Sequence, residues 1–439
     1  MMEKDSRSHL FLGTVIWSLA ALFYLYEFFL RVFVSTISDQ VIADLSLTAQ
    51  QFATMGAGYY LIYSFMQLPV GILVDRLGAR LLLTIAVFLA GLGGFSFAFV
   101  HGFSSGFLSR CFMGFGSSFA YVCLLVLALN WFPRKHFGLM AGIANFLGAA
   151  GPMLAGGPLA LLLTLFHDNW RLVIGGIGAL GFVLAVFIGV FVRNTPPRQK
   201  GEIIHLEPGK ESFLRRLGEL IRIPQVWAIV LYAGFVYVCL PLLGAYWGTS
   251  FLQARGFSRT VAASIASMMW VGLGVGSPVL GKISDSIKRR KPILYGSAFF
   301  GIVVTILVVY FHLENKLIYM ALFFLIGFVS AAQSVSFATI TEHVPTKLQA
   351  TAIGLNNSMI MFFAAVLPPI VSSFIGRSAA MHHEKAGHFT DADFQAGFFF
   401  MPIFYLCAYL LALFFIRETY CRQQFEVVKI SKSDLSNIP

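Results

Sequence analysis

Long apolar stretches alternate with short polar turns along almost the whole chain. Each stretch has at least the roughly 20 residues that a helix needs to cross a bilayer. The twelve stretches lie at residues 11–36, 50–74, 81–101, 104–131, 137–165, 171–192, 226–251, 259–281, 292–312, 317–341, 349–376 and 395–416. The alternating pattern of a membrane β-strand is absent, and a bilayer interior offers no partner for backbone groups outside a helix or closed barrel. The pattern therefore predicts an all-α membrane protein with twelve transmembrane helices.

The chain also contains an internal repeat. The turn Gly71-Ile-Leu-Val-Asp75-Arg76-Leu-Gly78-Ala-Arg80 has a weaker copy, shifted by 210, in which Gly281, Asp285, Arg289 and Arg290 stand. A second set, shifted by 212, pairs Pro133, Lys135, Gly142 and Asn145 with Pro345, Lys347, Gly354 and Asn357. Two unrelated spacings with nearly the same offset indicate a duplication. We expect two six-helix bundles at residues 1–192 and 226–416, a central loop at 193–225 and a tail at 417–439.

Composition and charge agree with a membrane protein. Charged residues make up 12% of the chain, about half of the roughly 25% in soluble domains. The net charge of +11 would favour nucleic-acid binding in a soluble protein, but 23 of the 31 Lys and Arg residues fall in turns on one side. The positive-inside rule puts that side, with both termini and the central loop, in the cytoplasm. We expect a lipid bilayer and no nucleic acid as partner. No turn on the other side carries an Asn-x-Ser/Thr sequon, which favours a bacterial inner membrane.

The repeated turn resembles the signature loop of the major facilitator superfamily, and Arg110-x-x-x-Gly114-x-Gly116 resembles a second motif of that family. The resemblance covers residues 11 to 416 and implies two bundles that rock about a central site to give alternating access. Tyr24, Arg31 and the following Asp44-Leu-Ser-Leu are similar to the organic-anion and sugar-phosphate permease branches. Phosphate exchangers of these branches carry a second basic residue on the seventh span, which this chain lacks.

The family's signature loop implies a latch between the bundles. Asp75 could accept hydrogen bonds from arginines and from a neighbouring helix N-terminus, in a contact shallow enough to release. The predicted latch residues are Gly71, Asp75, Arg76, Gly78, Arg80, Asp285 and Arg289. In the alternative interpretation, Arg76 and Arg80 only anchor the topology.

Three charges stand inside predicted spans: Glu27, Arg31 and Arg110. Each costs about 2.5–3.5 kcal/mol on insertion scales, so each is a functional candidate. Arg31 and Arg110 lie at matched depth and could together bind an anion, because a guanidinium binds carboxylate bidentately. In the alternative interpretation Glu27 neutralises Arg31, four residues away on the same helix face, and Arg110 packs structurally.

Glu27 is also the candidate for proton coupling. An anion that competes for Arg31 would leave Glu27 without its partner and able to take up a proton, which would link the two uptakes.

The C-terminal half supplies aromatic and amide groups instead of charges. Arg31 shifted by 210 falls on Pro241, so we expect an asymmetric site. The candidate substrate-binding residues, beside Arg31 and Arg110, are Tyr24, Tyr59, Tyr63, Asn145, Tyr237, Trp247, Gln333 and Asn357, with Tyr60, Tyr246 and Asn356 as further aromatic or amide candidates. For any single aromatic residue, packing against lipid or core is the alternative explanation.

No constellation in the sequence indicates an enzyme. The loop 377–394 collects His382, His383, Glu384, His388, Asp391 and Asp393, but without a helical HExxH arrangement, so we expect neither a metal nor a cofactor. The resemblance implies a monomeric secondary transporter, which we expect to import a small organic anion (a carboxylate, an amino-acid or peptide-like solute, or an anionic siderophore) with protons. The alternative is an exporter of drugs or metabolites.

Overall fold

A computed structural model describes residues 2–132, 137–195, 213–381 and 389–424, and within these ranges the chain is helical without strands. Eleven segments are long and apolar enough to cross a membrane. They are Phe11–Ser35, Ala79–Phe97, Phe103–Trp131, Phe146–Leu165, Trp170–Phe191, Pro224–Ala254, Arg259–Ile287, Lys291–Tyr310, Lys316–Glu342, Thr346–Met381 and Asp391–Phe415. All eleven coincide with predicted spans, which confirms the helical membrane architecture.

The remaining predicted span, residues 50–74, is divided into α3 (Ala49–Met66) and α4 (Val70–Leu77). Pro69 precedes α4, and a proline disfavours helical conformation in the residue before it, which explains the break at this point. Gln50, Gln51 and three tyrosines lower the hydropathy of α3. The twelfth span is therefore present as two consecutive helices, and α3 buries its tyrosines inside the protein.

The other helices of the first half are α1 (Met2–Val32), η1 (Phe33–Ser35), α2 (Ser38–Asp44), α5 (Ala79–Phe97), α6 (Phe103–Ser117), α7 (Ala120–Trp131), α8 (Phe137–Ala155), α9 (Gly157–Leu165) and α10 (Trp170–Phe191). A short amphipathic helix, α11 (Phe213–Leu220), lies in the predicted central loop. The second half contains α12 (Pro224–Tyr237), α13 (Cys239–Pro241), the π-helix η3 (Leu242–Trp247), α14 (Gly248–Ala254), α15 (Arg259–Ile287), α16 (Lys291–Tyr310), α17 (Lys316–Ser330), α18 (Gln333–Glu342), η4 (Thr346–Leu348), α19 (Gln349–Met381), α20 (Asp391–Phe398), α21 (Phe400–Leu410) and η5 (Leu411–Phe415).

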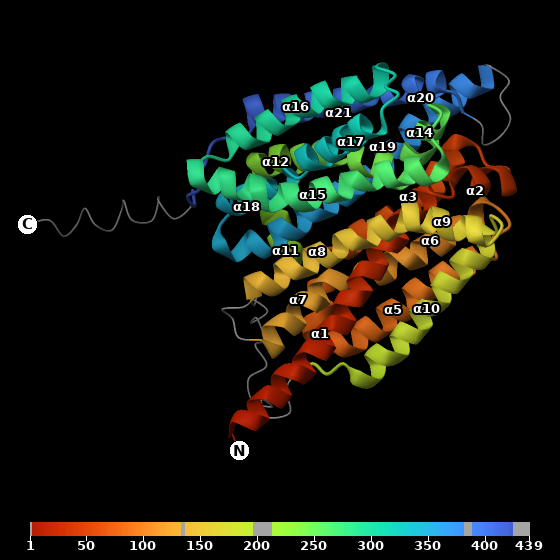
Figure 1. Ribbon diagram of the computed structural model, residues 1–439. Coiled ribbons are helices and arrows are strands. Elements are labelled where there is room, and N and C mark those ends of the chain that lie inside the picture. Colours follow the sequence, from red (N-terminus) through yellow and green to blue (C-terminus); the bar gives the residue numbers. More distant parts are fainter. Residues whose placement is uncertain (1, 133–136, 196–212, 382–388, 425–439) are drawn as a thin grey trace, which may run out of the picture.

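Helices of each half pack mainly with one another, as α5 does with α10 and α15 with α17. Glycines allow the closest of these contacts: a Cβ at Gly178 would lie 2.1 Å from the backbone nitrogen of Phe95 on α5. Such small residues let membrane helices approach at backbone distance. The two halves meet along α3 with α19 and along α8 with α15 (Figure 1).

The helix ends form two faces. The ends that bear Arg80 and Arg290 are called here the basic face, and the ends that bear α2, α9, α14 and α20 the opposite face (Figure 1).

Candidate substrate site

Glu27 and Arg31 form a buried ion pair on α1. Their exposed fractions are 0% and 3%, and Nη2 of Arg31 lies 3.1 Å from both carboxylate oxygens of Glu27. The spacing of four residues on a helix brings the two side chains together. The charges therefore compensate each other within one helix, as one of the two interpretations of the sequence predicts.

Aromatic rings of α1 and α3 surround this pair. The Tyr59 hydroxyl donates to Oε2 of Glu27 at 2.7 Å. The Arg31 guanidinium carbon lies 4.3 Å from the ring centre of Phe28 and 4.8 Å from that of Tyr63. Nε of Arg31 is buried and has no hydrogen-bond partner among the described residues. Arg31 is thus held by a carboxylate and by cation–π contacts, with one donor left unused.

The second half contributes Tyr237 to the same place. Tyr237 is 2% exposed at the end of α12 and interacts electrostatically with both Arg31 and Glu27. The ion pair therefore lies where the two halves meet.

Arg110, on α6, binds the backbone of α1. Its Nη1 donates to the carbonyl of Leu30 at 2.5 Å and its Nη2 to the carbonyl of Arg31 at 3.0 Å. Because α1 ends at Val32, these carbonyls belong to the last turn and have no partner within the helix. Arg110 therefore caps α1 from a neighbouring helix, next to Arg31 and only 1% exposed.

The remaining predicted substrate residues are spread along the interface between the halves. Tyr24 stacks on Tyr121 of α7, with ring centres 5.1 Å apart, one turn from Glu27 towards the basic face. Asn357 donates to Gln67 across the halves at 2.7 Å, also towards the basic face. Gln333 is half-buried at the start of α18. The side chain of Asn145 lies outside the described part of the structure.

Trp247 lies nearer to the opposite face than the ion pair. It is fully buried, donates to Ser372 at 2.7 Å and packs against Phe52 of the first half. Its indole N–H is therefore already used in packing the interface.

Sequence reasoning missed Phe28 and Tyr121, which contact the predicted residues Arg31 and Tyr24, and Trp270, which contacts Phe28. Phe28 stands three residues before Arg31, so its place on the same helix face could have been inferred. Tyr121 and Trp270 carry no comparable signal, because an aromatic residue in an apolar span looks like an ordinary packing residue.

The first signature loop is held within its own half. Arg80 donates to the carbonyl of Gly189 at 2.6 Å, and its backbone N–H donates to Oδ1 of Asn194 at 2.8 Å. Gly78 has a φ of +78°, and a Cβ there would meet Asn194 at 2.5 Å, so the turn requires glycine. Gly71 and Arg76 are exposed. The side chain of Asp75 lies outside the described part.

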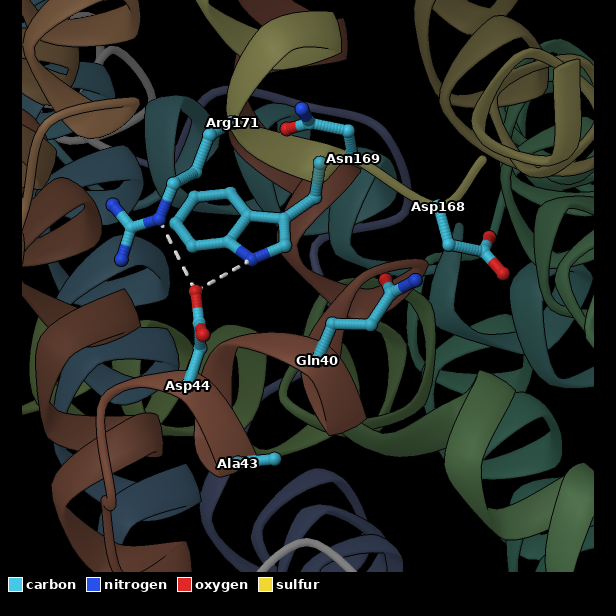
Figure 2. A pocket seen from close by; sticks show the side chains of 7 residues that line it. Gln40, Ala43, Asp44, Asp168, Asn169 and Arg171 are labelled. Carbon is cyan, nitrogen blue, oxygen red and sulfur yellow. Dashed lines mark hydrogen bonds and ion pairs between the residues drawn. The ribbon is translucent and has the colours of Figure 1, made fainter. Parts of the chain in front are cut away.

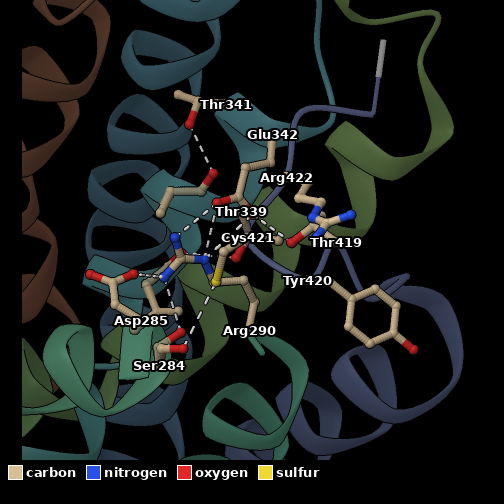
Figure 3. Close-up of polar contacts among 12 residues, drawn as sticks. Ser284, Asp285, Arg290, Thr339, Thr341, Glu342, Thr419, Tyr420, Cys421 and Arg422 are labelled. Atoms are coloured by element: carbon tan, nitrogen blue, oxygen red, sulfur yellow. Dashed lines mark hydrogen bonds and ion pairs between the residues drawn. The ribbon is translucent and has the colours of Figure 1, made fainter. Parts of the chain in front are cut away.

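Arg290, rather than Arg289, is the centre of the second copy of the loop (Figure 3). It donates to Asp285 at 2.5 Å and to Glu342 at 2.8 Å. Glu418, after the last span, accepts the backbone N–H groups of Arg290 and Lys291. The Arg289 guanidinium lies 5.7 Å from the ring centre of Tyr420. In this conformation both copies of the loop therefore bind within their own half.

At the opposite face, polar bonds join the two halves. Ser38 and Ser250 are 2.7 Å apart, Ser250 donates to Asp39 at 2.5 Å, and Arg259 pairs with Asp168. A hollow on this face has a volume of about 470 Å³ and is lined by Gln40, Ala43, Asp44, Asp168, Asn169, Trp170 and Arg171 (Figure 2). In it, Asp44 accepts from Arg171 and from the indole of Trp170. These bonds thus hold the two halves together at the opposite face.

The acidic loop before α20 is structural where it is described. Asp391 pairs with Arg255 at 2.7 Å, and Asp393 completes a capping box with Thr390. No cluster of potential metal ligands occurs in the described residues, and His382, His383, Glu384 and His388 lie outside them.

Comparison with known proteins agrees with this architecture. A bacterial homologue of the human lysosomal transporter Spinster, in an inward-facing and unoccupied conformation, has the same fold with a TM-score of 0.72, 16% sequence identity and coverage of 91% of this chain and 97% of that chain. The probable L-galactonate transporter of Escherichia coli K12 is 26% identical over 76% of each chain. The nitrate/nitrite transporter NrtP of Nostoc punctiforme is 28% identical over 43% of this chain and 37% of its own. The model of the Major Facilitator Superfamily matches residues 16–369, so this chain is a multi-pass membrane protein that belongs to that family of transporters, and not an enzyme.

Proposed function

We propose that this chain is a secondary active transporter of a small organic anion, driven by protons and working by alternating access. The anion binds at Arg31, between the halves. The basic face lies in the cytoplasm of a bacterial cell and the opposite face outside the inner membrane, and the transporter acts as a monomer.

The buried Glu27–Arg31 pair is the observation that carries this proposal. A buried ion pair gains little over well-packed apolar residues, so its stabilising effect does not explain its presence. Arg31 keeps one buried donor without a described partner, and the carboxylate of Glu27 is its only ion-pair partner among the described residues. An anion that approaches this guanidinium can accept a hydrogen bond from Nε–H of Arg31. It can also replace the Glu27 carboxylate as the ion-pair partner of Arg31.

Glu27 gives the site a route to proton coupling. While Arg31 and Tyr59 bind its carboxylate, the negative charge is compensated. When the substrate carboxylate takes over Arg31, two negative groups would share one guanidinium. Protonation of Glu27 relieves this repulsion, so binding of the anion and of a proton favour each other.

The relatives support an anionic substrate, since L-galactonate and nitrate share only their negative charge. The greater shared length with the L-galactonate transporter favours an organic carboxylate such as a sugar acid. A small inorganic oxyanion is the second candidate, and the similarity to the nitrate/nitrite transporter is what favours it.

Ligand-dependent melting of the purified full-length protein tests the proposal. A ligand that binds only the folded state raises its stability by RT ln(1 + [L]/Kd). We expect L-galactonate to raise the melting temperature, the neutral sugar L-galactose not to do so, and Arg31→Lys to lose most of the effect. The double variant Glu27→Gln/Arg31→Gln avoids an uncompensated buried charge and controls for folding. A shift that the folded double variant retains would exclude Arg31 as the anion's ligand, and a shift with nitrate alone would favour the second candidate.

A further inference from the structure

The polar groups of two aromatic side chains near Arg31 are buried without a hydrogen-bond partner in the described structure. They are the indole N–H of Trp270, on α15, and the hydroxyl of Tyr60, on α3. Their residues are 2% and 0% exposed. An unsatisfied buried donor costs about 1–3 kcal/mol, so two of them close to one site require an explanation.

Contacts link both groups to Arg31. Phe28, whose ring lies 4.3 Å from the Arg31 guanidinium, makes an edge contact with Trp270 at 6.0 Å between ring centres. In the other direction, Tyr59 lies 5.7 Å from the same guanidinium and 5.5 Å from Tyr60. Arg31 therefore lies between the two unpartnered groups, one from each half.

The π-helix η3 lies next to both unpartnered groups. Tyr246 of η3 lies 6.0 Å from Tyr60, and Gly244, two residues before it, lies against Trp270. A Cβ at Gly244 would be 2.9 Å from the indole nitrogen, so glycine leaves this N–H uncovered where other residues would crowd it. Single π-turns within α-helices are frequent at functional sites, which agrees with the position of η3 between the two groups.

The chemistry of the two groups selects a class of ligand. An indole N–H can only donate, whereas a tyrosine hydroxyl donates and accepts. Together they fit neutral oxygen atoms on a ligand whose charged end is at Arg31. Phe28 separates Trp270 from Arg31, so a single small ion such as nitrate does not contact both.

We propose that Trp270 and Tyr60 bind hydroxyl groups of the substrate, and that the substrate is therefore a polyhydroxylated carboxylate with a chain long enough to pass Phe28. This inference rests on the proposed function, because it takes Arg31 as the carboxylate site. Trp270 and Tyr60 then select substrates that carry hydroxyl groups, while Arg31 selects substrates that carry a negative charge.

Isothermal titration of the full-length protein with L-galactonate and with hexanoate tests this assignment. Hexanoate has the same six-carbon chain and carboxylate but no hydroxyl groups. We expect the wild type to bind L-galactonate more tightly, and Trp270→Phe to weaken L-galactonate about tenfold while hexanoate changes less than about twofold. Trp131→Phe is the matched control, because it removes an indole N–H that the Arg193 carbonyl already accepts, and it should leave the ratio of the two affinities unchanged.

Tyr60→Phe provides a second, independent variant, with Tyr232→Phe as its control, since the Tyr232 hydroxyl donates to Leu294 within the second half. Tyr60→Phe should also reduce the preference for L-galactonate. Equal weakening of both ligands by Trp270→Phe and Tyr60→Phe, or equal affinity of the wild type for both, would overturn the hydroxyl assignment while the anion site at Arg31 stands. Failure of the wild type to bind either carboxylate would overturn the proposed function, and this inference with it.

Discussion

Arg31 and Arg110 both lie against the ring of Tyr59, but their hydrogen bonds differ. Arg31 donates to a carboxylate, whereas Arg110 directs two donors at backbone carbonyls of α1. Arg110 is therefore suited to hold the last turn of α1, and with it Arg31, in place. In the proposed mechanism Arg110 positions Arg31, which binds the anion, and does not itself contact the anion.

Replacement of Arg110 by Gln tests whether Arg110 holds α1 in place or binds the anion. Two hydrogen bonds from a charged donor are lost and the Leu30 and Arg31 carbonyls lose their partner, so the free energy of unfolding should fall by about 3 kcal/mol or more. Thermal unfolding in detergent measures the change, with Arg110→Lys expected to retain part of the stability. A variant that melts like the wild type but no longer binds the anion would show that Arg110 is itself an anion ligand.

The ionisable residues of this site could be predicted from the sequence because a charge in an apolar span is conspicuous and costly. Trp270 could not be predicted, since nothing in the sequence distinguishes an aromatic residue with an unused N–H from one that only packs. The sequence does distinguish Arg290 from Arg289, because the shift of 210 between the two copies of the loop pairs Arg80 with Arg290. In the structure Arg290 donates to Asp285 and Glu342, and the role of Arg289 in a latch stays a prediction.

At the scale of helices, the Arg110-x-x-x-Gly114-x-Gly116 motif on α6 has a packing explanation. A Cβ at Gly114 would lie 2.2 Å from the carbonyl oxygen of Tyr59 on α3, and one at Gly116 would lie 2.3 Å from that of Ala86 on α5. The glycines thus bring α6 against two neighbours at once, which puts Arg110 within reach of α1.

Gly114→Ala should therefore destabilise the protein far more than the addition of one methyl group usually does. The added methyl group forces α6 away from the backbone of α3, so we expect a marked fall in the yield of folded protein and in its melting temperature. Size-exclusion chromatography and thermal unfolding measure both. Gly296→Ala is the control, because a Cβ there meets nothing within 4 Å in its helix α16. Similar behaviour of the two variants would refute the packing explanation.

Helix breaks were predictable where proline and glycine cluster. The stretch 148–157 contains Pro152 and four glycines, a composition typical of a bent or broken span, and the helix is interrupted at Gly156, between α8 and α9. The π-helix η3 was not predictable, because its sequence Leu-Leu-Gly-Ala-Tyr-Trp resembles that of an ordinary apolar helix.

At the scale of the whole molecule, the bonds between the halves are arranged around the ion pair. Ser250 with Asp39 and Arg259 with Asp168 join the halves at the opposite face, and Gln67 with Asn357 joins them towards the basic face, where the two signature loops bind within their own halves. Alternating access requires the opposite-face bonds to break. Asp168 is 57% exposed, so its pair with Arg259 contributes at most about 1 kcal/mol and can be released readily.

Arg259→Ala should shift the protein towards the conformation that is open at the opposite face, by about fivefold at most. Spin labels at Leu165 and Ser258, both exposed near this face, would report the shift as a larger fraction of long distances. Arg377→Ala is the control, since its guanidinium lies over Phe374 within its own half. An unchanged distance distribution in Arg259→Ala would mean that the ion pair does not hold the halves together.

The twelve spans were predictable because the bilayer imposes a minimum length of apolar helix, and the repeat of 210 residues indicated the duplication. The arrangement of the halves was not, since contacts such as Gln67 with Asn357 join residues whose sequence spacing is unrelated to the repeat.

The central claim is that Glu27 and Arg31 together couple an anion to a proton, and the most direct test is transport by Glu27→Gln in proteoliposomes. Wild-type protein should accumulate L-galactonate against its gradient when a proton gradient is imposed. Glu27→Gln keeps the size of the side chain and resembles the protonated carboxyl group in having an acceptor and a donor, but it cannot exchange a proton. It should lose this accumulation while still exchanging labelled for unlabelled L-galactonate at equal pH. Undiminished proton-driven accumulation by Glu27→Gln would contradict the account.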